Sequence, residues 1–100
     1  MQPITSFKNP KVKFLRSLRM RKYRRREGYF LAEGIHIVEE ALTCGAPVET
    51  LVYAPDLLVS ERARALVDRV ERSRRLVLSG DVFRTLGAGR TAGYYRSDPH

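Results

Sequence analysis

The stretch Tyr29–Ala54, "YFLAEGIHIVEEALTCGAPVETLVYA", contains two short apolar runs separated by a segment with helical periodicity. "YFLAE" at its start and "VETLVYA" at its end are rich in aromatic and β-branched residues, as buried strands are. Between them, Ile35, Val38 and Leu42 fall on one face of a helix, and Ile37 joins that face. A strand, a helix and a second strand in this order predict a βαβ unit.

A helix is predicted upstream, beginning at Asn9 and Pro10. An asparagine oxygen can cap the first turn, and the fixed backbone angle of proline suits the first helical position. The apolar residues that share one arc of this helix are Val12, Phe14, Leu15 and Leu18. Lys13 and Arg16 point the opposite way. One side of the helix is therefore expected to face the protein, and the other side a negatively charged partner.

Downstream, the sequence predicts two more helices with a strand between them. Ser60 is a candidate N-cap, and the i, i+3, i+4, i+7 pattern that follows comprises Ala63, Leu66, Val67 and Val70. Leu76–Leu78 is a third short apolar run. Ser79 is expected to cap a last short helix, whose inward-facing residues are Val82, Phe83 and Leu86.

Strands that alternate with helices predict an α/β fold with parallel strand pairings. The expected architecture is a small α/β/α sandwich with three or four strands and helices on both faces. The main domain is predicted over residues 1–86. Residues 87–100, "GAGRTAGYYRSDPH", are expected to form a tail or interdomain linker, mostly loop, with "GYYR" as a candidate edge strand.

The positive charge is concentrated at one end of the chain. The net charge is +8, yet residues 1–26 hold ten basic residues and no acid, and residues 27–100 sum to −2. Charge gathered in this way repels itself and favours a polyanionic partner. A basic face that is merely solvated is the alternative. Because five basic residues crowd into "RKYRRREG", we expect a frayed helix or a loop there, ending at Gly28.

Composition excludes several other classes of function. No apolar run is long enough for a membrane span, and the N-terminal residues lack a signal-peptide core, so a cytoplasmic protein is expected. Cys44 is the single cysteine, and His36 and His100 are too few and too poorly partnered to form a zinc site with it, since such sites need three or four ligands at recognisable spacings. We expect Cys44 to be a small packed residue. "GAGRTAG" lacks the Lys-Ser/Thr of a phosphate-binding loop.

Glu33 is the most interesting carboxylate. It ends a predicted strand and precedes a helix that opens at Gly34, the position where open α/β sheets present functional groups. Equally, it is placed to cap that helix by accepting hydrogen bonds from its first N–H groups. Both roles stay open at this point.

Taken together, "FKNPKVKFLRSLRMRKYRRREGYFLAEGIHIVEEAL" closely resembles the N-terminal substrate-binding domain of the SpoU/TrmH family of RNA 2′-O-ribose methyltransferases. "NPKVK", "RKYRRREG", "FLAEG" and "VEEAL" occur in order over Lys8–Leu42, and "LVYAPDLL" and "LVLSGDVFRTL" extend the likeness to about Leu86. The resemblance implies an α/β/α sandwich similar to ribosomal proteins that bind RNA kinks. It also implies a following SPOUT catalytic domain that binds S-adenosylmethionine at a dimer interface.

The resemblance implies an RNA-binding module, with rRNA as the expected partner. The expected RNA-binding residues, from the basic segment and the matching motifs, are Lys8, Asn9, Lys11, Lys13, Arg16, Arg21, Lys22, Tyr23, Arg24, Arg25, Arg26, Glu33 and Gly34. Arginines clamp phosphates through two hydrogen bonds, and Tyr23 offers a ring for stacking on a base. Phe30 also matches "FLAEG", but core packing is the favoured role for it. The role of Tyr23 is left open.

Because the chain ends at His100 without the catalytic motifs of that family, it is expected to hold no catalytic residue, metal or cofactor of its own. S-adenosylmethionine would belong to the missing domain. The fragment is expected to be a monomer, and a homodimer if that domain were present. Two alternatives are a stand-alone structural ribonucleoprotein and a non-specific binder of DNA or acidic membrane.

Overall fold

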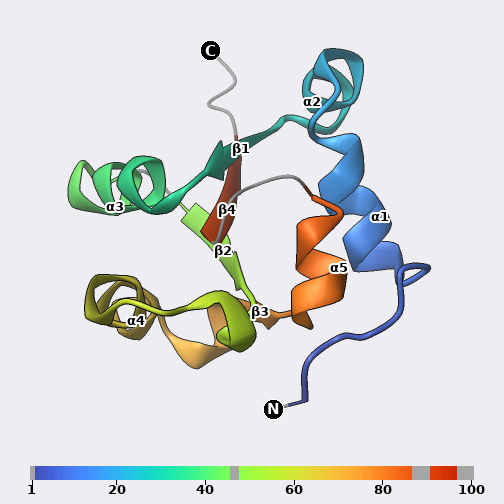
Figure 1. The fold of residues 1–100 in the computed structure, drawn as a ribbon. Helices are drawn as coiled ribbons and strands as arrows, with labels where there is room; N and C mark the ends of the chain where they lie inside the picture. The colour runs from blue at the N-terminus through green and yellow to red at the C-terminus, as the bar shows by residue number, and fades with distance from the viewer. Residues whose placement is uncertain (1, 46–47, 87–90, 97–100) are drawn as a thin grey trace.

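The computed structural model describes residues 2–45, 48–86 and 91–96, the last six as backbone (Figure 1). The helices and strands, in chain order, are α1 (Pro10–Ser17), α2 (Arg21–Glu27), β1 (Tyr29–Glu33), α3 (Ile35–Thr43), β2 (Val48–Tyr53), η1 (Pro55–Leu57), α4 (Glu61–Asp68), η2 (Arg72–Arg74), β3 (Arg75–Val77), α5 (Gly80–Arg84) and β4 (Thr91–Arg96), where η denotes a 3₁₀ helix. None of the helices within these ranges is long and apolar enough to cross a bilayer.

The four strands form one sheet in the order β1-β4-β2-β3. β2 and β3 pair in parallel, whereas β4 runs antiparallel to both β1 and β2. In the register, Leu31 lies opposite Tyr94 and Leu51 lies opposite Gly93. The expected α/β class is confirmed, but the sheet is mixed because the last strand inserts between the first two.

The insertion of β4 corrects what the sequence predicted for the end of the chain. Thr91–Arg96 is a strand rather than a loop, and it lies in the interior of the sheet rather than at its edge. Its partners are remote in sequence, so the local Gly-rich pattern gave no indication of them. The rest of the predicted tail, 87–90 and 97–100, lies outside the described residues.

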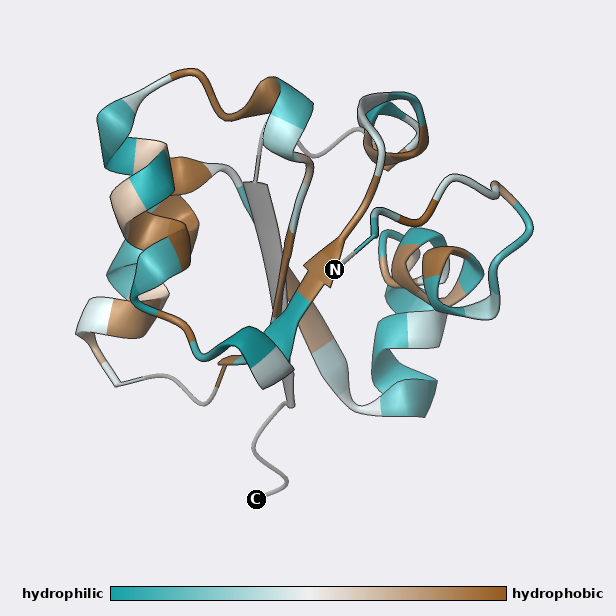
Figure 2. Ribbon diagram, turned by 90° about the horizontal axis from the view of Figure 1, so that it is seen from below, coloured by the Kyte–Doolittle hydropathy of each residue, from teal (hydrophilic) through white to brown (hydrophobic). Residues whose placement is uncertain are grey.

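Helices cover both faces of the sheet, as predicted (Figure 2). On one face, Val12 and Leu15 from α1 and Phe83 from α5 pack with Val52 of β2. On the other face, Val38 from α3 and Leu66 from α4 pack with Leu51 of the same strand. Adjacent residues of β2 thus serve opposite cores, as the alternation of a strand requires.

The predicted helix caps are confirmed by hydrogen bonds. The side chains of Asn9, Ser60 and Ser79 accept from the backbone N–H groups of Lys11, Ala63 and Val82, respectively. α3 is followed by Gly45 with a φ of 77°, the left-handed conformation expected after its last turn. Each cap satisfies N–H or C=O groups that the helix leaves unpaired at its ends.

Two predictions for α3 are wrong. Ile37 is 55% exposed instead of joining the buried face that Val38 leads, because the helix shows only a narrow stripe to the sheet. Cys44 is exposed at the C-cap of α3 rather than packed. Its position at the helix end places it beyond the two cores that the helices cover.

The chain before α1 lies beside β3. The Ile4 N–H donates to the Val77 carbonyl, and the Ser79 N–H donates to the Ile4 carbonyl, so Ile4 forms a parallel bridge with Leu78. An edge strand with unpaired backbone groups invites pairing with other chains. The bridge at Ile4 covers the end of the β3 edge.

Candidate nucleic-acid interface

α1 is amphipathic in the way the sequence predicts. Its residues Val12 and Leu15 are buried on the side that faces the protein, and Lys11 and Lys13 are exposed on the outer side. Lys8 is exposed just before the helix. Arg16 is half-buried as a whole, and its guanidinium donates to the Phe7 carbonyl, so it also fixes the approach to α1.

Asn9 has a structural role that limits what it can offer to a ligand. Its Oδ1 accepts a hydrogen bond of 2.8 Å from the Lys11 N–H at the start of α1. Its direct contact with RNA stays a prediction.

The basic segment after α1 is a helix, which corrects the expected fraying or loop. α2 runs from Arg21 to Glu27 and ends at Gly28, whose φ is 75°. Four of its five basic side chains are exposed to water, where ions screen their mutual repulsion. Three arginines occupy its last turn, where positive charge interacts favourably with the helix dipole.

Arg24 fixes α2 against α1. Its Nη1 donates hydrogen bonds of 3.0 Å to the carbonyls of Leu18 and Arg19, at the C-terminal end of α1. These carbonyls have no partner within the helix, so Arg24 satisfies them. Arg21, Lys22, Arg25 and Arg26 of the same helix are all exposed.

Tyr23 lies half-buried among charged neighbours. The Lys22 Nζ is 5.0 Å from its ring centroid, and the Arg26 Cζ is 4.6 Å from it. Cation–π contacts of this kind hold the two cations close to the ring. Stacking of Tyr23 on a base stays a prediction.

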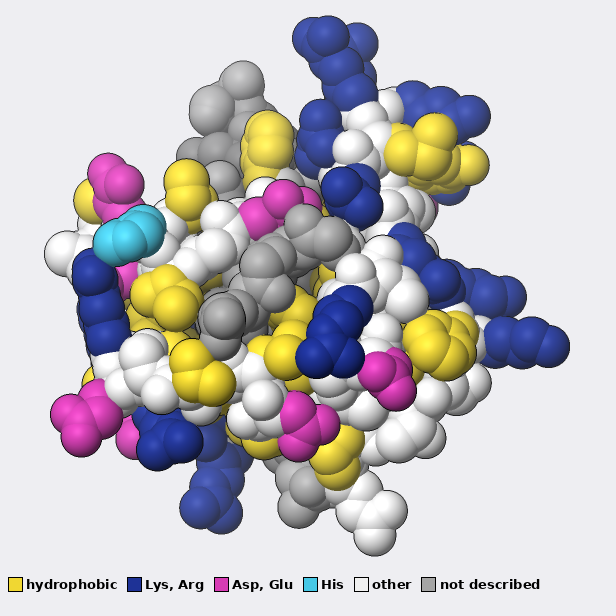
Figure 3. Space-filling model, in the orientation of Figure 1, with side chains coloured by type: hydrophobic (Ala, Val, Ile, Leu, Met, Phe, Trp, Pro, Cys, Tyr) yellow, Lys and Arg dark blue, Asp and Glu magenta, His cyan; other side chains and the backbone are white. Residues whose placement is uncertain are grey.

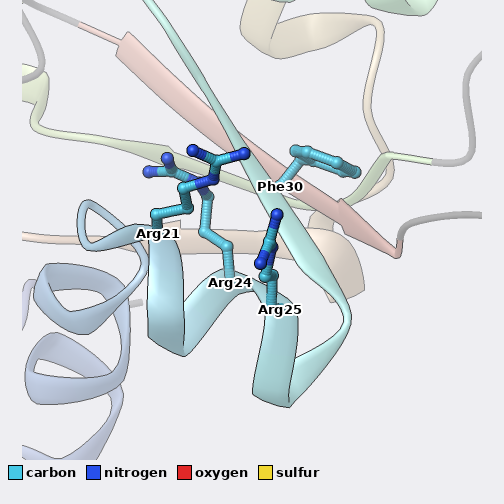
Figure 4. Close-up of a pocket in the computed structure, with 4 residues that line it drawn as sticks. All are labelled: Arg21, Arg24, Arg25 and Phe30. Carbon is cyan, nitrogen blue, oxygen red and sulfur yellow. The ribbon is translucent and has the colours of Figure 1, made fainter.

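Phe30 projects from β1 beside the arginines of α2 (Figure 4). It is 46% exposed, so the core packing expected for it is wrong. It lines a cavity of about 430 Å³ together with Arg21, Arg24 and Arg25. β1 is an edge strand of the sheet, and α2, which precedes it in the chain, buries none of its residues.

A second cavity of about 480 Å³ shares Arg24 with the first. Its lining also includes Leu18, Arg19, Leu31, Glu33 and Ile37. The Arg19 Nε lies 3.9 Å from the Glu33 Oε1, with both side chains over 40% exposed. The two cavities lie on either side of β1, because Phe30 in the first and Leu31 in the second are successive residues of the strand and face opposite ways.

The two roles left open for Glu33 are now distinguishable. α3 begins after Gly34, and no side chain caps it by a hydrogen bond, so the capping role is not seen. Glu33 instead pairs with Arg19, a residue that the predicted site omitted although it belongs to the basic segment. Gly34 has a φ of 92°, which a residue with a side chain rarely adopts.

The resulting surface is strongly positive. We call the exposed or half-buried basic side chains from Lys8 to Arg26 the basic surface; its members are Lys8, Lys11, Lys13, Arg16, Arg19, Arg21, Lys22, Arg24, Arg25 and Arg26. Lys and Arg side chains gather over α2 and α1, whereas the side of α4 shows both signs of charge (Figure 3). Among the described residues, no three His, Cys, Asp or Glu side chains cluster as a metal site would need.

The comparisons with known proteins agree with this geometry. Residues 9–92 match the family model of the MRM3-like substrate-binding domain. A solved RNA 2′-O ribose methyltransferase shares the fold with a TM-score of 0.82 and 26% identity, over 99% of this chain and 39% of that one. No curated protein matches.

Two further solved structures are similar. An rRNA methyltransferase from Sinorhizobium meliloti has a TM-score of 0.70 and 30% identity, over 99% of this chain and 38% of that one. The SpoU methyltransferase AviRb from Streptomyces viridochromogenes, in complex with AdoMet, has a TM-score of 0.73 and 26% identity, over 90% of this chain and 34% of that one. The chain thus spans between about a third and two fifths of the length of these enzymes. By the family match over 9–92, this chain belongs to the MRM3-like substrate-binding domains, as its resemblance to the SpoU/TrmH methyltransferases predicted.

Proposed function

We propose that the chain binds structured RNA, with rRNA as its target class, and presents it to an S-adenosylmethionine-dependent 2′-O-ribose methyltransferase domain. The substrate-binding family and the names of the similar enzymes support this proposal. In this proposal, the catalytic domain transfers the methyl group, and this chain binds the RNA substrate. We place the module in the cytoplasm, monomeric by itself and dimeric when joined to such a domain.

The observation that carries the proposal is the basic surface. Eight of its ten basic side chains lie on α1 and α2, Lys8 and Arg19 lie just before and between these helices, and the described residues 2–26 contain no acid. Exposed arginines bind phosphates through two parallel hydrogen bonds, and lysines act as mobile point charges. Surfaces of this kind bind nucleic acids by releasing the counterions condensed on the phosphates.

The first cavity of this surface does not suit S-adenosylmethionine. Its sulfonium carries a positive charge, and the first cavity is lined by Arg21, Arg24 and Arg25. Like charges at such distances repel each other. The proposal therefore assigns that cofactor to the catalytic domain.

The test is an RNA-binding titration with rRNA fragments at several salt concentrations. We compare the wild-type chain with a double variant, Arg21→Gln/Arg25→Gln, which removes two exposed charges and spares the hydrogen bonds of Arg24. At about 0.7–0.9 per lost phosphate contact, the slope of log K against log salt should fall by about 1.4–1.8.

The matched control is Arg64→Gln/Arg69→Gln, which removes two exposed arginines at α4. It lowers the net charge equally and should leave the slope unchanged. Equal effects of both double variants would show that total charge, not the basic surface, determines binding. No effect of either would overturn the proposed function.

A further inference from the structure

The cavity between α2 and β1 combines an exposed aromatic ring with three guanidinium groups. Phe30 keeps 46% of its surface exposed, although the next two residues of β1, Leu31 and Ala32, are half-buried and buried. Arg21 and Arg25 line the same cavity and are themselves exposed. An apolar ring and several phosphate-binding groups thus open into one space (Figure 4).

These two kinds of group bind different parts of a nucleotide. Guanidinium groups bind phosphate oxygens, and an aromatic ring binds the face of a base. A regular RNA duplex presents its phosphates but keeps the faces of its bases stacked inside, so it would leave Phe30 without a partner in the RNA. A nucleotide that has left the stack offers a base and its phosphates within the reach of one cavity.

The size and the anchoring of the cavity suit such a ligand. Its volume of about 430 Å³ falls within the range of roughly 300–1,000 Å³ that small-molecule sites occupy. Arg24 is held by the carbonyls of Leu18 and Arg19, which fixes one wall. Within the part of the chain that the structure describes, no side-chain hydrogen bond anchors Arg21 or Arg25, so their charged ends can follow the phosphates.

We infer that this cavity binds one unstacked nucleotide of the RNA, with its base on the Phe30 ring and its flanking phosphates on Arg21 and Arg25. The inference rests on the proposed function and narrows its substrate class to RNA with an unpaired nucleotide. In this inference, Phe30 distinguishes an unstacked nucleotide from a regular duplex, and the surrounding arginines bind its phosphates.

The experiment pairs two RNAs with three forms of the full chain. The RNAs are a hairpin with a single bulged adenosine and the same hairpin without the bulge. The proteins are the wild type, Phe30→Leu and Phe7→Leu. Leucine keeps an apolar side chain but removes the ring, and Phe7 is the matched control because it is a second phenylalanine with 47% exposure. Thermal unfolding of each variant confirms that it is folded.

We expect the wild type to prefer the bulged hairpin and Phe30→Leu to lose that preference. The loss on the bulged RNA should be about 5- to 140-fold, which corresponds to roughly 1–3 kcal/mol per stacked base. Binding to the fully paired hairpin should not change, and Phe7→Leu should behave as the wild type with both RNAs. A Phe30→Tyr variant, which keeps the ring, should retain the preference for the bulge.

The outcomes separate this inference from the proposed function. If the wild type binds both hairpins equally, with strong salt dependence and no effect of Phe30→Leu, the nucleotide site is wrong and the RNA-binding function stands. An equal loss on both hairpins also overturns the site, because it shows a general role for Phe30. If the wild type binds no RNA, both proposals fail.

Discussion

α2 and α4 have seven and eight residues, yet they relate to the rest of the molecule in opposite ways. α4 buries Ala63, Leu66 and Val67 and carries acids and arginines in equal measure along its outer side. α2 buries none of its residues, and Glu27 at its end is its single acid. α4 serves the core, and its charges are balanced within the fold. α2 buries little apolar surface, and most of its positive charges stay exposed, where a partner can bind them.

The two helices therefore have different expected roles: α4 stabilises the fold, and α2 binds the RNA. A helix that packs by its apolar stripe should be sensitive to truncation of buried side chains and indifferent to the loss of one surface charge. A helix that is held by a hydrogen-bonding arginine and a glycine cap should be sensitive to substitution of those two residues, and it has no buried side chain to truncate. Four substitutions, in order of decreasing expected effect, test this contrast.

The largest effect is expected for Leu66→Ala on α4. Leu66 is 1% exposed, and truncating a buried leucine lowers the free energy of unfolding by about 2–5 kcal/mol. Arg25→Ala on α2 should change it by no more than about 0.5 kcal/mol, as is usual for an exposed site. Urea denaturation of both variants measures the difference. Comparable destabilisation by Arg25→Ala would show that α2 belongs to the core after all.

The next effect concerns the glycine that ends α2. Gly28 has a φ of 75°, and alanine in this left-handed conformation costs about 1–2 kcal/mol. Gly45 after α3 has a φ of 77°, so Gly45→Ala should be destabilised similarly in the same urea experiment. Only Gly28→Ala should also weaken RNA binding, because it disturbs the placement of α2. If the two variants bind RNA equally well, α2 does not take part in RNA binding.

A smaller effect is expected for Arg24→Gln, which tests whether one side chain serves both purposes. Its hydrogen bonds to the carbonyls of Leu18 and Arg19 should be worth about 0.5–1.5 kcal/mol of folding free energy. Arg21→Gln removes the same charge from the same helix and should leave the stability unchanged. Thermal unfolding distinguishes the two variants. Arg24 is solely an RNA ligand if they unfold at the same temperature.

The smallest effect is expected at the ion pair between α3 and α4. The Arg62 guanidinium hydrogen-bonds Glu39 and lowers the pKa of that carboxyl below its ordinary value of about 4.3. A pKa lowered by folding adds stability above the unfolded-state value, and this stability is lost as the pH falls through the folded-state value. In urea titrations from pH 7 to pH 3, the free energy of unfolding of the wild type should fall by a small increment. Glu39→Gln lacks this increment at every pH. Parallel pH profiles would show that the pair contributes nothing.

The same contrast explains how much could be predicted from the sequence. α4 was predicted with its N-cap Ser60 and its buried face, because apolar periodicity records packing against a core. α2 was missed as a helix because nothing in "RKYRRREG" repeats with an apolar period. What holds it is the Arg24 hydrogen bonds to the preceding helix, which no sequence pattern encodes.

The candidate site shows the same limit. Its charge was visible in the sequence, and so were most of its basic residues. Phe30 was assigned to the core, because an apolar residue in a strand gives no indication of which strand lies at the edge. That depends on β4, whose position between β1 and β2 is decided by pairing between residues from 38 (Tyr53 with Thr91) to 67 (Tyr29 with Arg96) positions apart.

The central position of β4 also has a consequence for how the chain folds during synthesis. β1 and β2 do not pair with each other, so the sheet stays divided until Thr91–Arg96 has emerged from the ribosome. Pairings so distant in sequence close late and slowly. A nascent chain that ends at Leu86 would hold both sets of helices without the strand that joins β1 to β2. Such a chain should expose strand edges and engage chaperones, and the domain should become protease-resistant only once its last strand is available.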